Sequence, residues 1–228
     1  MPETILIVAA TDSEAEIIRK IEGIRDRKES FRFRDLDISV LATGVGTVMT
    51  AWKMKQWLSQ YPRPSLAINI GIAGTFKEEI ETGEVVIPVT DCFADMGIET
   101  DSGFITLFEA GLSDPDRFPF RNGWINTDSA VLSRLPKILR QVRAITVNTS
   151  SGSSETISRY VLKYNPDIET MEGAAFFYVC SSEKIPFISL RAVSNRIMPR
   201  RKGKWDIPAA LENLSQRLHE VLLMTEIS

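Results

Sequence analysis

The chain has 228 residues, of which 43% are hydrophobic and 25% are charged, as expected for one folded domain with a sizeable core. The formal net charge of −3 gives no support for a nucleic-acid partner or an anionic membrane surface, and no apolar run approaches the roughly 18–20 residues of a membrane span. The two cysteines, Cys92 and Cys180, lack metal-ligand spacing, so we expect one cytoplasmic domain over residues 1–228, with reduced thiols and no metal.

Short apolar runs alternate with helical patterns along the chain. Strands are predicted near residues 4–10, 38–42, 66–70, 85–89, 144–147 and 186–194, and several of them are apolar on both faces. Helices are predicted from Thr11 through a stripe of isoleucines that ends at Ile24, and over residues 47–60, 154–164, 172–183 and 208–224. Residues 91–127 read as an excursion from this core, in which FADMG and FITLFEAG could form short strands. Strands followed by helices predict a three-layer α/β fold with its sites at the carboxyl ends of strands.

The segment TDSE, which opens the first predicted helix, has two interpretations. Thr11 and Glu14 match an S/T-x-x-E capping box, which stabilises a helix start by roughly 0.5–2 kcal/mol. Glu14 also lies just beyond the carboxyl end of a strand, where a carboxylate could act as a general base toward water. The two roles can coexist, although a carboxylate that caps a helix is a poorer base.

Two glycine-rich segments are predicted to turn the chain after strands. TGVGT, at residues 43–47, is followed by Met49 where a dinucleotide-binding fingerprint needs its third glycine, so a nicotinamide cofactor site is not expected. Tight strand-to-helix packing explains this segment equally well. In NIGIAGT, at residues 69–75, Gly71 and Gly74 would let the backbone approach a ligand closely.

A second carboxylate, Glu172, opens a helix that is apolar almost all round. The helix dipole favours an acid in the first turn by about 0.3–1 kcal/mol, which is a purely structural explanation. A buried carboxylate nevertheless needs partners, and a ribose 2′,3′-diol would supply two donors. Arg191, in the strand that ends at Ser194 and Asn195, is a candidate partner for the same group.

Two polar segments complete the set of candidates. VNTSSGSSET, at residues 147–156, reads as a loop followed by a helix N-cap. Residues 196–205 are strongly basic and form either a solvated loop or a lid over an anionic substrate group, with Arg196, Arg200, Arg201, Lys202 and Lys204.

Five segments then occur in a fixed order between residues 7 and 195: IVAATDSEAE, ATGVGTV, INIGIAGTF, ETMEGAAFFYVC and PFISLRAVSN. Together they resemble the purine nucleoside phosphorylase and nucleosidase superfamily. The resemblance implies a mixed central sheet flanked by helices, a small nucleoside substrate, no cofactor, and a homo-oligomer, a dimer or higher, whose neighbour helps close the site. It also implies that Met171 and Glu172 hold the ribose, and that the base lies near Ala73, Gly74, Asn148 and Thr149. Arg191 and Ser194 are further expected substrate-binding residues.

The first loop decides between phosphate and water as the nucleophile in this family. Phosphorylases present glycine and arginine to phosphate there, whereas this chain presents Asp12, Glu14 and Glu16. Carboxylates repel phosphate but can activate water, so hydrolysis with Glu14 as the general base is expected.

Asn195 departs from the adenine nucleosidases of the family. Those that cleave methylthioadenosine and S-adenosylhomocysteine end the late strand in Ser-Asp, and the aspartate protonates adenine N7. Here the pair is Ser194-Asn195, and an amide NH₂ can donate to the two acceptors, O6 and N7, of a 6-oxopurine. A mismatched buried polar pair costs about 1–3 kcal/mol, so Asn195 should favour hypoxanthine or guanine as the leaving group.

The run RAVSN-x4-R-x4-W-x-IP-x-ALENL, residues 191–214, resembles one hydrolase branch of the family. That branch releases hypoxanthine, in menaquinone biosynthesis, from a nucleoside that carries a benzoate on its ribose side. Arg200 or Arg201 could pair with such a carboxylate. The alternatives are an adenine-directed nucleosidase, a purine nucleoside phosphorylase, and a nucleoside-binding protein without catalytic activity.

Overall fold

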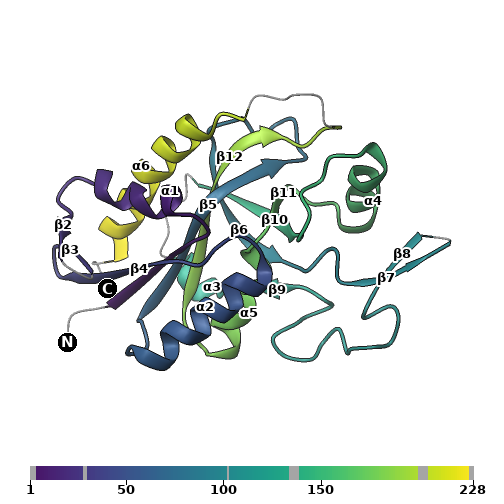
Figure 1. The fold of residues 1–228 in the computed structure, drawn as a ribbon, viewed down its shortest axis with the longest axis horizontal. Helices are drawn as coiled ribbons and strands as arrows, with labels where there is room; N and C mark the ends of the chain where they lie inside the picture. The colour runs from purple at the N-terminus through teal and green to yellow at the C-terminus, as the bar shows by residue number, and fades with distance from the viewer. Residues whose placement is uncertain (1–3, 28–29, 102, 134–138, 200–204, 226–228) are drawn as a thin grey trace.

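The computed structural model describes residues 4–27, 30–101, 103–133, 139–199 and 205–225 (Figure 1). In chain order the elements are β1 (Thr4–Ala9), α1 (Asp12–Ala15), the 3₁₀ helix η1 (Glu16–Lys20), β2 (Arg25–Asp26), β3 (Phe31–Phe33), β4 (Leu36–Ala42), α2 (Thr47–Gln60), β5 (Leu66–Thr75), β6 (Val85–Asp91), β7 (Gly97–Thr100), β8 (Gly103–Thr106), β9 (Ile125–Asn126), α3 (Ser129–Leu132), β10 (Arg140–Thr146), α4 (Ser154–Tyr164), β11 (Ile168–Thr170), α5 (Gly173–Ser182), β12 (Phe187–Arg196) and α6 (Ile207–Thr225).

The main sheet is mixed and runs in the order β11-β10-β6-β12-β5-β1-β4-β3-β2, with β9 paired to β6. Strands β4, β1, β5 and β12 are mutually parallel, whereas β12 and β6 are antiparallel. The edge strand β11 also pairs with β5, in antiparallel orientation, through Ile168 with Thr75 and Glu169 with Gly74. This second pairing curls one half of the sheet back on itself and brings the chain after β11 to the carboxyl end of β5.

Helices cover both faces of the sheet, which confirms the predicted three layers (Figure 1). Strand β1 explains why, because its side chains alternate between two cores. Ile5 and Ile7 join the core under α6, with Leu214, Leu218 and Leu222. Leu6 and Val8 join the core under α2 and α5, with Met54, Phe176 and Phe177. A strand that is apolar at every position must be buried on both sides.

The first predicted helix differs from the observed one. Only residues Asp12–Ala15 are α-helical, and the chain continues as the 3₁₀ helix η1 to Lys20. The isoleucines still pack inward, since Ile17, Ile18 and Ile21 are all buried. Their spacing therefore predicted correctly that these side chains are buried, but it did not predict the type of helix. A tighter 3₁₀ segment can bury the same side chains.

The prediction of a glycine turn at NIGIAGT is wrong, because β5 runs without a break to Thr75. Its neighbour β12 stays in register with it as far as Arg196, apart from a bulge between Val193 and Asn195.

By contrast, α2 and α4 have the predicted bounds, 47–60 and 154–164. In the 91–127 excursion, β7 and β8 form a separate hairpin, and FADMG contributes only Gly97 to a strand.

Candidate active site

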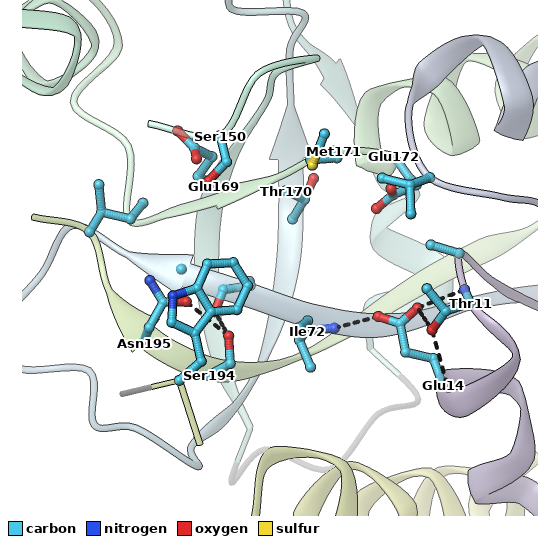
Figure 2. A pocket seen from close by; sticks show the side chains of 16 residues that line it. Thr11, Glu14, Ile72, Ser150, Glu169, Thr170, Met171, Glu172, Ser194 and Asn195 are labelled. Atoms are coloured by element: carbon cyan, nitrogen blue, oxygen red, sulfur yellow. Dashed lines mark hydrogen bonds between the residues drawn. The ribbon is translucent and has the colours of Figure 1, made fainter. Parts of the chain in front are cut away.

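A pocket opens where β1, β5 and β12 end and α5 begins (Figure 2). It encloses a cavity of about 200 Å³. Its walls are mostly apolar, with a few polar groups at fixed places: Ala10, Thr11, Glu14, Val45, Ile72, Ala73, Gly74, Ser150, Glu169, Thr170, Met171, Glu172, Ser194, Asn195, Ile197 and Trp205. Segments from seven parts of the sequence therefore meet in one cavity.

Glu14 caps the first helix and lines the pocket at the same time. The capping box is complete: Glu14 Oε2 accepts hydrogen bonds from the Thr11 hydroxyl at 2.9 Å and from the Thr11 backbone N–H at 3.0 Å. Glu14 Oε1 accepts from the backbone N–H of Ile72, on β5, at 3.0 Å. A carboxylate has about four acceptor positions, so these three bonds leave one for a ligand or a water molecule.

Glu172 occupies the N-cap position of α5, but its side chain does not cap that helix. Its Oε1 instead accepts a 2.9 Å hydrogen bond from the backbone N–H of Gly46. Gly46 has a positive φ of 99°, a conformation that favours glycine, so the TGVGT segment serves to aim an N–H at this carboxylate. Burial raises the pKa of Glu172, and the charge of Arg191 together with the Gly46 bond counteracts part of that rise.

Arg191, predicted to contact substrate, lies beneath the pocket rather than on its wall. The residue is 1% exposed, and its Nη2 donates a hydrogen bond to the side chain of Asn69. A Cβ atom at Gly71 would collide with the guanidinium and would lie 2.8 Å from Glu14 Oε1. Gly71 therefore makes room for Arg191 and Glu14, not for a ligand. The charge of Arg191 acts on Glu172 through space, without an ion pair among the described residues.

Ser194 and Asn195 lie just before the last residue of β12 and line the pocket. The Ser194 hydroxyl lies 2.9 Å from Asn195 Oδ1 and fixes the orientation of the amide (Figure 2). Asn195 Nδ2 donates one hydrogen bond, of 3.2 Å, to the carbonyl of Arg196. An amide nitrogen carries two hydrogens, so one donor remains for a ligand. Gly74 lies against this group, since a Cβ atom there would stand 3.3 Å from Asn195 Nδ2.

Glu169 is a third buried carboxylate of the pocket, and sequence reasoning missed it. It is 5% exposed and accepts hydrogen bonds from the backbone N–H of Ser151, at 2.9 Å, and from the Ser151 hydroxyl. Burial raises its pKa, and the hydrogen bonds from Ser151 lower it in part. Its position two residues before the Met171-Glu172 pair could have drawn attention, but nothing in the sequence marked residues 168–170 as a strand.

The other predicted residues divide into three groups. Met171, Ala73 and Gly74 line the pocket. Asn148 and Thr149 do not: Asn148 is held by Asp95 and Thr47, and Ser150 from the same loop reaches the pocket instead. Arg200 and Arg201 lie outside the described residues. Val45 also lines the pocket and was not predicted. Ile197 and Trp205 line it too, and both belong to the segment 196–205, for which a lid was one of the two predictions.

The described lining contains three carboxylates and no lysine or arginine. Within the described part of the chain, no group of histidine, cysteine and acidic side chains is arranged to hold a metal ion. No helix among those residues is both long and apolar enough to cross a membrane. The arrangement suits a neutral, polar ligand with hydroxyl donors at one end and acceptors at the other.

Comparisons with known proteins show the family and the fold. The sequence profile of the phosphorylase superfamily matches residues 4–225. The futalosine hydrolase of Streptomyces coelicolor is 29% identical over 195 residues, 82% of this chain and 79% of that protein. The 5′-methylthioadenosine/S-adenosylhomocysteine nucleosidase of Marinomonas is 25% identical over 227 residues, 95% of this chain and 96% of that protein. A Helicobacter pylori nucleosidase variant, crystallised with 5′-methylthioadenosine in its active site, has the same fold, with a TM-score of 0.76 over 97% of this chain and 99% of that one at 14% identity.

Proposed function

We propose that this chain, which belongs to the phosphorylase superfamily, hydrolyses the N-glycosidic bond of futalosine. The products are hypoxanthine and dehypoxanthine futalosine. Its relatives include both futalosine hydrolases and methylthioadenosine/S-adenosylhomocysteine nucleosidases at similar identity, so overall similarity does not choose the base. The choice rests on the residues of the pocket.

Asn195 is the observation that carries the proposal. Its Oδ1 is engaged by Ser194, so the side chain presents an N–H donor to the pocket. The N7 and O6 atoms of hypoxanthine are both acceptors, whereas adenine pairs N7 with an amino donor. A donor at this point stabilises hypoxanthine as it leaves with the electrons of the broken C1′–N9 bond.

Water is the proposed nucleophile, and Glu14 is its general base. The one open acceptor position of Glu14 suffices to hold a water molecule, while Thr11 and Ile72 hold the carboxylate still. Phosphate would need a cation, and the described lining supplies none. This argument favours hydrolysis over phosphorolysis.

Glu172 is proposed to hold the ribose. Beyond the bond from Gly46, and a backbone hydrogen bond from Met171, the carboxylate keeps acceptor positions for the 2′- and 3′-hydroxyls. The negative charges of Glu172 and Glu14 also stabilise the positive charge that develops on the ribose in an oxocarbenium-like transition state. A non-catalytic binding protein could also use Glu172 to hold the ribose, but it would need no general base at the position of Glu14.

The test exchanges the base-reading residue. Asn195→Asp should move the ratio of kcat/KM for futalosine to that for methylthioadenosine toward adenine by about 10- to 100-fold, because a carboxyl group opposes O6 but accepts from the adenine amino group. Asn213→Asp, on α6 and outside the pocket, is the matched control and should leave the ratio unchanged. An unchanged ratio in Asn195→Asp would refute the role of Asn195.

We also propose that the protein acts in the cytoplasm as a homo-oligomer. Both cysteines are buried and unpaired, as suits a reducing compartment. Helix α2 exposes Val48, Met49 and Trp52 beside Val45 at the mouth of the pocket, so a neighbouring copy could cover these side chains.

A further inference from the structure

Asp91, a fully buried carboxylate at the end of β6, has no role in the proposed reaction. Its two oxygens accept from the hydroxyl of Thr146, on β10, at 3.0 and 3.1 Å. It also lies against the start of α5, because a Cβ atom at Gly173 would collide with Asp91 Oδ2. Glycine at the first position of α5 therefore lets a buried carboxylate approach the helix N-terminus closely.

The first backbone N–H groups of α5 are satisfied by two threonines and not by the side chain at the N-cap. Gly173 N–H donates to the Thr170 hydroxyl at 3.2 Å, and Ala174 N–H donates to Thr146 Oγ1 at 2.8 Å. These groups have no partner within a helix, and the N-cap side chain normally accepts one of them. Here the N-cap is Glu172, whose side chain makes no capping bond. Hydroxyls from β10 and β11 thus replace the usual cap.

The hydrogen-bonding capacity of Thr146 is fully used. A threonine hydroxyl has one hydrogen to donate and two lone pairs that accept. The hydrogen goes to Asp91, and the lone pairs accept from Ala174 N–H and from the Thr170 hydroxyl, 3.1 Å away. Thr170 still accepts from Gly173 N–H. Asp91 therefore sets the direction of the whole chain of bonds, in which Thr170 donates to Thr146 and Thr146 donates to Asp91.

Glu172 is the group that this arrangement leaves free. A carboxylate at a helix start is attracted to the unpaired N–H groups and to the helix dipole. Since other acceptors occupy those groups, the Glu172 carboxylate extends to Gly46 instead and accepts its N–H at 2.9 Å. Figure 2 shows Glu172 and Glu14 at the same end of the pocket, which is the place of the ribose in the proposed function.

We infer that Thr146 and Asp91 are positioning residues, which cap the start of α5 so that Glu172 can bind the ribose. This inference rests on the proposed function and deepens it, because both residues act on the substrate through Glu172. Without the Thr146 hydroxyl, the Ala174 N–H is buried and has lost its acceptor. Glu172, two residues before Ala174, can restore that bond by capping α5, and its carboxylate then leaves the ribose.

The experiment pairs a variant with a substrate that lacks a group held by Glu172. In Thr146→Val, which keeps the shape of the side chain but not its hydroxyl, kcat/KM for futalosine should fall about 10- to 100-fold. The value for 2′-deoxyfutalosine should fall much less, because that substrate has already lost one of the hydroxyls. Equal losses on both substrates would mean that Thr146 only supports the fold, and would overturn the inference, as would unchanged values for both.

The matched control is Thr127→Val. It removes another buried hydroxyl, one that bonds the carbonyl of Pro88 on β6, outside the pocket, and it should change neither value. Thr146→Ser and Thr146→Ala differ only by the hydroxyl and add no volume, so they repeat the test if the valine variant does not fold. The serine variant should keep the preference for futalosine over its 2′-deoxy analogue, and the alanine variant should lose it. The same preference in both would refute the role of the hydroxyl.

A double-mutant cycle shows whether Thr146 acts through Glu172. Glu172→Gln alone should lower the preference for futalosine over 2′-deoxyfutalosine, and the addition of Thr146→Val should lower it no further. Additive losses would overturn the inference. For Asp91, the asparagine variant keeps an acceptor for Thr146 and should retain the preference, whereas Asp91→Ala should lower it. Equal preferences in these two variants would remove Asp91 from the assignment.

Failure of the proposed function looks different from failure of this inference. In the first case, the wild-type protein releases no hypoxanthine from futalosine. Release of hypoxanthine by the wild type, with an unchanged substrate preference in Thr146→Val, would refute the positioning role alone.

Discussion

Glu14 illustrates how one side chain can satisfy two competing interpretations. Four letters of sequence, TDSE, suffice to predict its capping box, and the structure confirms it. The same four letters cannot reveal that Ile72, on a strand 58 positions later, holds the second oxygen toward the pocket. The capping hydrogen bonds therefore orient the carboxylate for its proposed chemistry and still leave it one acceptor position.

Removing the charge of Glu14 tests that chemistry. Glu14→Gln should lower kcat for futalosine by about 10²- to 10⁴-fold, because an amide cannot take a proton from water. Glu16→Gln, an exposed carboxylate in the next turn, should keep full activity. Thermal unfolding followed by circular dichroism would verify that both variants fold. A Glu14→Gln enzyme within a few-fold of the wild type would exclude Glu14 as the base.

The residues that sequence reasoning found share one property: each stands beside a recognisable local pattern. Asn195 ends an apolar strand, and Glu172 opens an apolar helix. Glu169 has no such neighbour, because β11 is three residues long and gains its place only through pairing with distant strands. Arg191 lies on the predicted strand, but its side chain donates to Asn69 and does not line the pocket.

At the scale of elements, β5 shows the limit of local signals. Glycines usually mark turns, yet Gly71 and Gly74 lie inside a ten-residue strand. Their reason is steric and comes from other parts of the chain, since Gly71 faces Arg191 and Gly74 faces Ile197 and Asn195. No property of residues 69–75 alone distinguishes this use of glycine from a turn.

A buried chain of hydrogen bonds joins the end of β6 to the start of α5, and the sequence does not reveal it. Asp91, at the end of β6, is fully buried and accepts hydrogen bonds from Thr146 at 3.0 and 3.1 Å. Thr146 Oγ1 in turn accepts from the backbone N–H of Ala174, in the first turn of α5. Burial raises the pKa of Asp91 to about 7, against the lowering effects of Thr146 and of the Arg191 charge.

The raised pKa predicts a pH dependence of stability. The folded state binds the Asp91 proton more tightly than the unfolded state does. The free energy of unfolding that this difference contributes is fully present below about pH 4 and is lost as the pH rises through about 7. Asp91→Asn keeps an acceptor for Thr146 but cannot ionise. In urea unfolding, the free energy of unfolding should fall between pH 5 and pH 8 in both proteins. The fall should be smaller in Asp91→Asn than in the wild type, by on the order of 1–4 kcal/mol. Equal losses in both proteins would contradict a buried Asp91 with a raised pKa.

For the whole molecule, the three layers could be predicted from the sequence, but the second pairing of the edge strand β11, with β5, could not. Apolar strands and amphipathic helices indicate a covered sheet from their periodicity alone. The antiparallel pairing of β11 with β5 depends on residues nearly 100 positions apart, and it is this pairing that carries Glu169, Met171 and Glu172 to the ends of β5 and β12. The pocket is thus a product of topology more than of any one motif.

Assembly is the prediction that belongs to this scale. Val48 is 73% exposed and Trp52 is 69% exposed on α2, which is unusual for such large apolar side chains unless another surface covers them. Light scattering on the purified protein should give a mass of a dimer or higher, and Trp52→Glu should shift it toward the monomer of 25.6 kDa. A wild-type protein that is monomeric at micromolar concentration would contradict the proposed assembly.

The central claim is that this pocket uses water to release a 6-oxopurine. Its most direct test is a base-release assay with the purified protein on futalosine, inosine and methylthioadenosine, each with and without phosphate. We expect hypoxanthine from futalosine at a rate that phosphate does not change, and little adenine from methylthioadenosine. Adenine as the preferred product would contradict the reading of Asn195, and strict dependence on phosphate would contradict the role of Glu14.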